Sequence, residues 1–267
     1  MRVLTKILGM VLAAGLPLMA GNAQADVLKN VKEAGKIRIA MDLGIPPWSY
    51  KDQNLKNTGS EVETAELFAK DLGVELEIVP TTGANRIPFL LSGKADIVLS
   101  TLGITDERKK IIQYSIPYSG ANNVVAAPKN MAIGSFADLA GKTIGVTRGT
   151  MLDTAVTAGA PSDATVVRFE DEATTMSALV SGQVPIIGQT ESLIGQINQR
   201  NPSLNLEPKF VLTTVYYGIA MRKGEDAMQT YANEWVKTNL ANGKLAAIYK
   251  KFQGSSLPED ILAAKPR

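Results

Sequence analysis

The chain has 267 residues, of which 45% are hydrophobic and 20% are charged, a composition typical of a globular protein. It contains no cysteine and no histidine. This excludes disulfides, thiol nucleophiles and thiolate metal sites, and it removes the side chain that most often serves as general base or metal ligand. We therefore expect no cofactor and no metal ion, and the composition favours binding over catalysis.

The first 25 residues have the pattern of a secretory signal peptide. Arg2 and Lys6 come before an almost wholly apolar run from Ile7 to Ala20, and Ala23-Gln24-Ala25 supplies the small residues of a cleavage site. The apolar run is too short, and its flanks are wrong, for a membrane span. An N-terminal anchor helix is the alternative interpretation.

Cleavage before Asp26 would leave a soluble and formally neutral chain. It removes two basic residues and no acidic residue, so that 26 basic residues remain against 26 acidic ones. A neutral chain lacks the basic patch of a nucleic-acid-binding protein and the polybasic segment of a membrane-surface protein. We expect a periplasmic protein with no nucleic-acid partner.

Strand-like and helix-like segments alternate through the first part of the remaining chain. Val74, Leu76 and Ile78 alternate with glutamates, as in a half-buried strand. The other expected elements are strands at 37–43 and 95–101 and helices at 61–72 and 86–92. This β-α-β-α-β order predicts a parallel sheet with right-handed crossovers.

The pattern then begins again in a second α/β unit. Strands are expected at 124–127, 143–147, 166–169 and 184–188, and helices at 135–139, from 150, at 171–181 and at 191–200. Ser135 and Asp138 have the spacing of a capping box. A single extended stretch at 210–222 and two helices, 226–240 and 244–252, follow, and we expect the polar tail from Gly254 to be loosely held.

Five ordered blocks of this sequence resemble one protein family. The chain is similar to the polar amino-acid-binding proteins of bacterial ABC importers, which have the type II periplasmic solute-binding fold. The resemblance rests on the loop with Pro46-Pro47-Trp48, on Asn85 to Pro88 with Leu91 to Asp96, on Ser100 to Arg108 with Tyr114 to Tyr118, on Phe136 to Thr150, and on Tyr217 to Arg222.

The resemblance implies an α/β fold of two lobes, each a mostly parallel sheet flanked by helices. Lobe 1 would comprise 26–118 plus 215–267, and lobe 2 would comprise 119–214. The chain would cross between the lobes near 119–123 and 213–217, and closure over a ligand would be a hinge motion at these crossings. We expect a monomer that binds its ligand in the inter-lobe cleft and passes it to a membrane permease.

The family's carboxylate clamp falls on Arg108. A guanidinium donates two parallel hydrogen bonds to a carboxylate, although spacing alone also allows a surface arginine. Thr150 begins a predicted helix, where a hydroxyl and free N–H groups favour an anion; the alternative is a helix cap without a ligand. The resemblance adds contacts from Ser100 and Thr101. Gly103 stands where relatives often carry a hydroxyl side chain, which leaves its N–H.

Three more residues bear on which ligand is bound. Arg86 lies in a motif shared with binders of acidic amino acids, where it reaches the ligand's side-chain carboxylate; it could instead form a salt bridge at its helix start. Asp42 and Trp48 flank the first loop, and Trp48 would be a cleft wall or simple loop packing. The aromatic sandwich of cationic-amino-acid binders is replaced by Ile45 and Gly83, which argues against a flat cationic side chain.

Lobe 2 departs from the family pattern at the partner of the ligand's ammonium group. The resemblance implies an aspartate at the position that Thr190 occupies. Glu191 could substitute, or Gln189 could make a neutral contact, because a buried ammonium without a charged partner is costly. Otherwise the ligand is not an ordinary α-amino acid.

The leading hypothesis is therefore an importer's solute receptor for an acidic or neutral polar amino acid. The alternative is an enzyme similar to the cyclohexadienyl dehydratases, which share the fold, with Glu191 as general acid. A third possibility is a sensor lobe that feeds a membrane kinase, but no transmembrane segment or kinase follows in the sequence.

The signal peptide yields a direct prediction. The protein secreted by its native host should begin at Asp26, because the Ala-Gln-Ala motif ends at residue 25. N-terminal sequencing of the secreted protein measures this. A membrane-bound product that retains residues 1–25 would contradict the prediction.

Overall fold

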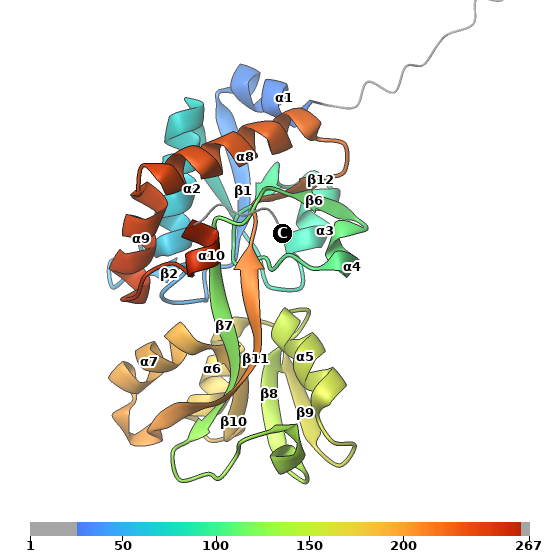
Figure 1. Ribbon diagram of the computed structural model, residues 1–267, viewed down its shortest axis with the longest axis vertical. Coiled ribbons are helices and arrows are strands. Elements are labelled where there is room, and N and C mark those ends of the chain that lie inside the picture. The colour runs from blue at the N-terminus through green and yellow to red at the C-terminus, as the bar shows by residue number, and fades with distance from the viewer. Residues whose placement is uncertain (1–25, 263–267) are drawn as a thin grey trace, which may run out of the picture.

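The computed structural model describes residues 26–262, which divide between two five-stranded sheets (Figure 1). The predicted signal peptide lies outside the described residues. Each sheet carries helices on its faces, as the α/β pattern predicts. None of the helices within 26–262 has the length and hydropathy needed to cross a membrane.

The sheet of lobe 1 has the strand order β4-β1-β5-β12-β6. β1 pairs in parallel with β4 and β5, whereas β12 is antiparallel to both of its neighbours, β5 and β6. β12 is thus the one reversed strand of this sheet. The strands are β1 (Lys36–Met41), β4 (Glu75–Pro80), β5 (Ile97–Val98), β6 (Ile112–Tyr114) and β12 (Ala220–Arg222).

Lobe 1 also contains seven of the helices in the described chain and a small hairpin. The helices are α1 (Val27–Ala34), α2 (Ser60–Leu72), α3 (Arg86–Leu91), α4 (Asp106–Lys109), α8 (Asp226–Ala241), α9 (Lys244–Gln253) and α10 (Glu259–Leu262), and the hairpin is β2 (Tyr50–Lys51) with β3 (Asn57–Thr58).

The sheet of lobe 2 repeats this topology with the order β11-β7-β10-β8-β9. β8 pairs in parallel with β9 and β10, and β7 is antiparallel to its neighbours β10 and β11. Four of the five strands in each sheet therefore run the same way, which confirms the mostly parallel sheets expected from the sequence. The strands are β7 (Ser119–Pro128), β8 (Thr143–Thr147), β9 (Thr165–Phe169), β10 (Ile186–Thr190) and β11 (Leu206–Tyr217).

Three α-helices and two short 3-10 helices flank the sheet of lobe 2. Ser135 and Asp138 form the predicted capping box at the first 3-10 helix. Gln189 and Thr190 at the end of β10 lead directly into α7. The helices are η1 (Phe136–Leu139), α5 (Met151–Gly159), α6 (Glu172–Val180), α7 (Glu191–Arg200) and η2 (Pro202–Leu204).

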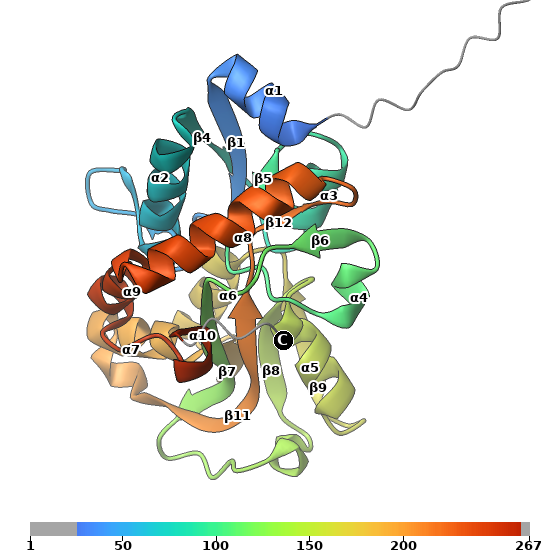
Figure 2. The same ribbon diagram turned by 45° about the horizontal axis from the view of Figure 1, so that its top comes forward.

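The long strands β7 and β11 connect the lobes, as both views in Figures 1 and 2 show. They pair antiparallel from one lobe to the other, with Ser119 opposite Tyr217 and Asn123 opposite Thr213. A two-stranded ribbon can twist without breaking its hydrogen bonds, which suits a hinge. The lobe boundaries at 118/119 and 214/215 stay a prediction.

Three segments differ from the sequence-based expectation. The sequence pattern did not predict the first helix, α1, because Val27–Ala34 has only two buried residues, Val27 and Val31. The expected single strand at 210–222 is interrupted between β11 and β12. The expectation of a loose tail is wrong as far as α10, because Leu257 and Ile261 are each only 3% exposed and belong to the lobe 1 core.

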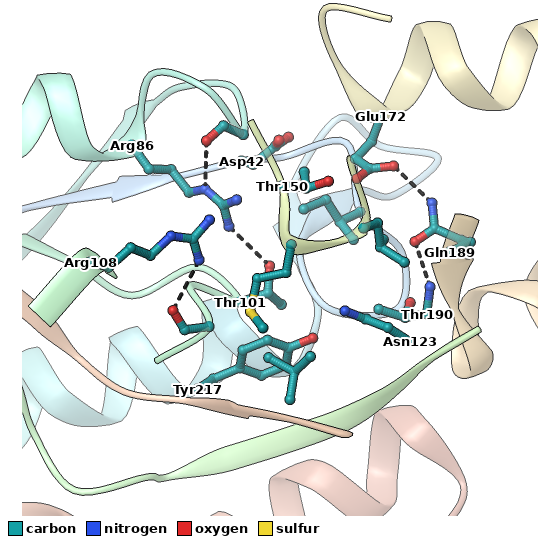
Figure 3. Close-up of a pocket in the computed structure, with 16 residues that line it drawn as sticks. Asp42, Arg86, Thr101, Arg108, Asn123, Thr150, Glu172, Gln189, Thr190 and Tyr217 are labelled. Carbon is teal, nitrogen blue, oxygen red and sulfur yellow. Dashed lines mark hydrogen bonds between the residues drawn. The ribbon is translucent and has the colours of Figure 1, made fainter. Parts of the chain in front are cut away.

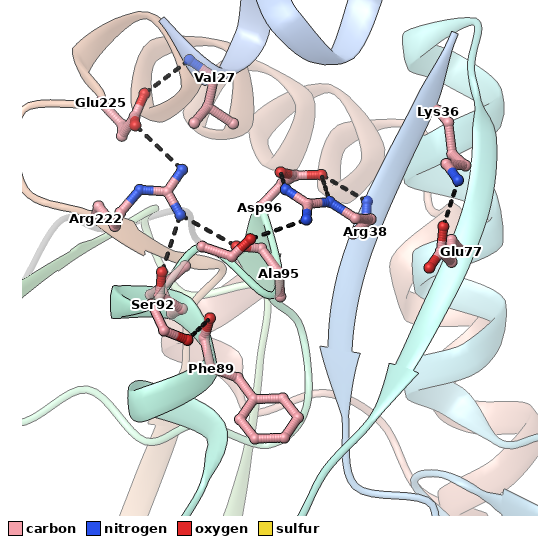
Figure 4. A network of polar contacts seen from close by, with 12 residues as sticks. Val27, Lys36, Arg38, Glu77, Phe89, Ser92, Ala95, Asp96, Arg222 and Glu225 are labelled. Carbon is pink, nitrogen blue, oxygen red and sulfur yellow. Dashed lines mark hydrogen bonds and ion pairs between the residues drawn. The ribbon is translucent and has the colours of Figure 1, made fainter. Parts of the chain in front are cut away.

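Partly buried charged side chains link the strands of lobe 1 to one another and to the backbone around them (Figure 4). Arg38 on β1 donates to both carboxylate oxygens of Asp96, at 3.2 and 2.6 Å. Arg222 on β12 donates to the carbonyls of Leu90 and Ala95, and the backbone N–H of Val27 donates to Glu225. Such charge-assisted bonds are stronger than neutral ones, so they hold β1, β5 and β12 in register.

A buried carboxyl group links helix α2 to the segment that leads into β7. Glu61, in the first turn of α2, is 1% exposed. It accepts a hydrogen bond from the hydroxyl of Tyr118 at 2.5 Å and one from the backbone of Thr101. Tyr118 immediately precedes β7. Burial is the main cause that raises the pKa of Glu61 to about 7.

The raised pKa of Glu61 predicts how stability changes with pH. Between the unfolded pKa of 4.5 and about 7, the folded state binds the proton more tightly, so the free energy of unfolding falls as pH rises through this window. The loss is on the order of 3 kcal/mol. Glu61→Gln should remove this part of the slope, so that the variant matches the parent near pH 4.5 and exceeds it at pH 8.

Urea unfolding at several pH values measures this difference. Glu66→Gln is the matched control, because Glu66 lies on the same helix and is exposed. A Glu61→Gln variant that is less stable than the parent by the same amount at every pH would show that Glu61 is ionised throughout.

Candidate functional site

A pocket lies between the two lobes and is lined by both. The space between its lining residues, including the part open to solvent, is about 450 Å³. Most of the polar lining follows the carboxyl ends of parallel strands, the usual position for a ligand in such sheets. The lining residues are Asp42, Ile45, Gly83, Arg86, Thr101, Gly103, Arg108, Asn123, Thr150, Met151, Leu152, Glu172, Gln189, Thr190, Val215 and Tyr217.

The lobes touch each other around this pocket at glycines. The guanidinium of Arg108 donates across the cleft to the carbonyl of Gly149, at 3.3 Å. A Cβ on Gly149 would lie 3.0 Å from the Cα of Ala84. A Cβ on Gly103 would lie only 2.1 Å from Sδ of Met151. The side chain that Gly103 lacks is therefore replaced by a methionine from the opposite lobe.

Arg108, the candidate carboxylate clamp, lines the pocket. It lies in α4, a single turn whose N-cap, Thr105, accepts from the N–H of Arg108. Its guanidinium also donates to the carbonyl of Gly103, at 3.0 Å. Burial, and then the positive charge of Arg86, lower the pKa of Arg108. Because the two guanidinium groups repel each other, an anion bound beside them would be stabilised by both positive charges (Figure 3).

Arg86 is held firmly although it is charged. It is 3% exposed, and it donates to the carbonyls of Gly83 and Ser100 at 3.1 and 2.6 Å. The hydroxyl of Thr101 lies 3.5 Å away. These partners are neutral oxygens rather than the salt bridge considered from the sequence, and the charge of Arg86 acts at longer range on the buried carboxyl groups of Asp42 and Glu172.

Ser100 and Thr101 have different positions. Ser100 does not line the pocket; its hydroxyl accepts from the backbone N–H of Asp42 at 2.8 Å and so positions that loop. Thr101 does line the pocket, in a left-handed conformation with φ 48°. Such a conformation is costly for a threonine, and the hydrogen bond from its backbone to Glu61 helps to hold it.

Thr150 lines the pocket, but its hydroxyl also caps α5. It accepts from the N–H of Asp153 at 3.2 Å and donates to the carbonyl of Thr147 at 2.8 Å. What this segment presents to the pocket is therefore mainly the first turn of α5, including Met151 and Leu152. N–H groups in a first turn have no partner within the helix and favour an anion.

Two acidic side chains lie in the pocket, one from each lobe. Asp42 follows β1, and Glu172 begins α6; both are 4% exposed. Glu172 accepts from the amide of Gln189 at 2.8 Å, and Gln189 in turn accepts from the N–H of Thr190 at 2.7 Å. Burial is the main cause that raises the pKa of Glu172 to about 7, and burial also raises the pKa of Asp42.

Trp48 corrects the expectation of a cleft wall. It is fully buried in the lobe 1 core and does not line the pocket. Its ring packs edge-on against Tyr217 and Tyr249, with centroids 5.3 and 5.8 Å apart. The reason lies in the loop: the N–H of Trp48 bonds back to the carbonyl of Ile45, and this tight turn directs the ring into the core.

Glu191 corrects the expectation for the ammonium partner. It begins α7 on the exposed side, where it accepts from the side chain of Asn122 at 3.2 Å. Thr190, one residue earlier, and Gln189 do line the pocket. Sequence reasoning passed over Glu172, although its place after a parallel strand, at a helix start, is the same signal that singled out Thr150.

The fold and the pocket agree with a known family. A model of the bacterial extracellular solute-binding proteins, family 3, matches residues 37–255. The L-cystine-binding protein TcyJ of Escherichia coli (strain K12) is 28% identical over 254 residues, which are 94% of each chain. Other relatives are named as binding proteins for histidine, glutamine and arginine.

Solved structures give the same result. A P235GK mutant of ArgBP from T. maritima has a TM-score of 0.79 and 29% identity over 86% of this chain and 100% of that one. The ancestral amino acid-binding protein AncCDT-1, a precursor of cyclohexadienyl dehydratase, has a TM-score of 0.76 and 32% identity over 85% and 99%. With these relatives, the chain is a binding protein rather than an enzyme, and it belongs to the bacterial extracellular solute-binding proteins of family 3.

Proposed function

We propose that this protein is the periplasmic receptor of an ABC importer, that it captures an amino acid with no net charge, and that it delivers this ligand to a membrane permease. The observation that carries the proposal is the balance of charge in the pocket. Arg86 and Arg108 are opposed by Asp42 and Glu172. A zwitterion brings one charge of each sign, so it can pair with both sets.

The carboxylate of the ligand would bind at Arg108. This guanidinium lies beside Arg86 and faces the first turn of α5 across the cleft. A carboxylate there would accept from the two-pronged guanidinium of one lobe and from helix N–H groups of the other. Gripping one group from both lobes would couple binding to closure.

The residues that line the pocket favour a ligand with a neutral polar side chain over one with a cationic or an acidic side chain. Ile45 and Gly83 supply no aromatic ring on which a flat cationic side chain could stack. A second carboxylate on the ligand would meet two buried acids. Gln189 and Asn123 offer amide groups, which both donate and accept. Among the ligands for which relatives are named, cystine and glutamine have no net charge.

The dehydratase alternative from the sequence required Glu191 as general acid. Because that side chain is outside the pocket, we do not propose this activity.

A ligand screen tests the proposal. Thermal shift and calorimetry with the twenty proteinogenic L-amino acids and L-cystine should find binding confined to one or a few uncharged ones. Native mass spectrometry of the protein as purified would identify any ligand retained from the cell. Binding of none of these compounds would overturn the proposal.

Arg108→Ala should abolish useful binding and leave the fold intact. Removing one partner of a desolvated charge pair costs roughly 3–5 kcal/mol. The affinity for the amino acid found in the screen should fall by roughly a hundred- to a few-thousand-fold. Arg108→Lys should recover only part of this, because a point charge cannot reproduce the two-pronged geometry.

Calorimetry beside a thermal melt measures both effects. Lys109→Ala is the matched control, because Lys109 is the next residue along and its exposed side chain pairs with Asp106 outside the pocket. If Arg108→Ala binds within about threefold of the parent, the carboxylate lies elsewhere.

A further inference from the structure

We infer that Asp42 and Glu172, one from each lobe, form the subsite that holds the ammonium group of the bound amino acid. They would do so in place of an acid at position 190, where this chain has a threonine. The inference rests on the proposed function, and it names the residues that distinguish an amino acid from other carboxylates.

The two acids come together because the lobes meet at the loop that follows β1. A Cβ on Gly44 would lie 3.3 Å from Oδ1 of Asp42, 3.6 Å from the N–H nitrogen of Ala173 and 3.7 Å from Cβ of Glu172. The backbone of Gly44 thus rests against the first turn of α6. Figure 3 shows Glu172 beside Gln189 and Thr190, away from the guanidinium of Arg108.

The hydrogen bonds at this end of the pocket leave acceptors without donors. Oδ1 of Asp42 accepts from the N–H of Gly44 at 3.0 Å. Oδ2 of Asp42 is buried and has no hydrogen-bond partner among the described residues, and the same is true of the Thr190 hydroxyl. The amide of Gln189 is held at both of its ends, by Glu172 and by the backbone of Thr190.

An ammonium group is the complement of this arrangement. It carries three N–H donors and no acceptor, and it brings the positive charge that two buried carboxylates require. Leaving such acceptors buried and unpaired is costly. Closure of the cleft over a carboxylate ligand that has no ammonium group would therefore cost free energy.

The groups that surround the two acids do not neutralise both. Glu172 faces Asp42, Arg86, Tyr217, Gln189 and Thr147. Asp42 faces Arg86 and the backbone N–H groups of Gly44 and Gly83, and the negative charge of Asp171 also acts on it. Arg86 directs its N–H groups to carbonyls instead. Burial raises the pKa of Glu172 to about 7, so the pair retains a proton below that pH.

Because the two acids share this proton, the affinity for a ligand without an ammonium group should depend on pH, which a purely structural role of the acids would not produce. Calorimetry compares the amino acid that binds with its deaminated analogue, such as glutaramate for glutamine or dithiodipropionate for cystine. The amino acid should bind with an affinity that does not change between pH 5 and pH 8. The analogue should bind at least about thirtyfold more weakly at neutral pH, because it leaves the acids unpaired.

The pH dependence of the analogue follows from the sign of the shift. Burial is the main cause that raises the pKa of Glu172 from its ordinary value of 4.5 to about 7, so an opening of the cleft that exposes this side chain to water should lower its pKa again. Binding of the analogue should therefore take up close to one proton between these values. Its affinity should fall about tenfold for each pH unit within that window and level off above it.

Glu172→Gln tests the residue itself. The variant should bind the amino acid about ten- to a hundredfold more weakly than the parent, while its affinity for the deaminated analogue becomes independent of pH. Asp42→Asn should weaken amino-acid binding in the same direction and serves as the second variant if Glu172→Gln does not fold. Glu191→Gln is the matched control, since Glu191 lies outside the pocket, and it should bind both compounds as the parent does.

The outcomes separate this inference from the proposed function. If the parent binds an amino acid and Glu172→Gln and Asp42→Asn bind it equally well, the ammonium subsite is refuted and the receptor function stands. If the analogue binds as tightly as the amino acid at every pH, the subsite is refuted as well. If the parent binds no amino acid at all, the proposed function and this inference fail together.

Discussion

The constraint on which this structure depends is the burial of charge in a cleft that closes. Arg86, Asp42 and Glu172 are each less than 5% exposed, and Arg108 reaches across to the opposite lobe. A buried charge is tolerated only where it is paired or hydrogen-bonded. For the proposed receptor, the cleft would select its ligand by the pattern of charges that the ligand must supply.

Hydrogen bonds within the protein orient these charged groups. Arg86 is fixed by two carbonyl groups, Ser100 holds the backbone of Asp42, and Gln189 holds Glu172. Polar groups that are already oriented lose little conformational entropy on binding. The same reasoning explains why the pocket rests on strand ends and helix starts, which are the rigid parts of both lobes.

Close approach of the lobes depends on glycines at their contact points. Gly83 and Gly103 in lobe 1 and Gly149 in lobe 2 all lie where an added Cβ would press on the opposite lobe. The pairing of Gly103 with Met151 is one example. The space beside a residue without a side chain in one lobe is occupied by a side chain from the other, so the two surfaces fit closely.

The sequence by itself determined the alternation of strands and helices, the family, and the positions of Arg86, Arg108 and Thr150. It could do so because motifs placed directly after parallel strands must meet at one edge of a sheet. Only the tertiary structure decided the directions of single side chains. Thr190 enters the pocket while Glu191, one residue later, faces outward, and Trp48 turns into the core. Adjacent residues point in different directions, so which of them meets the opposite lobe depends on how the two lobes pack together.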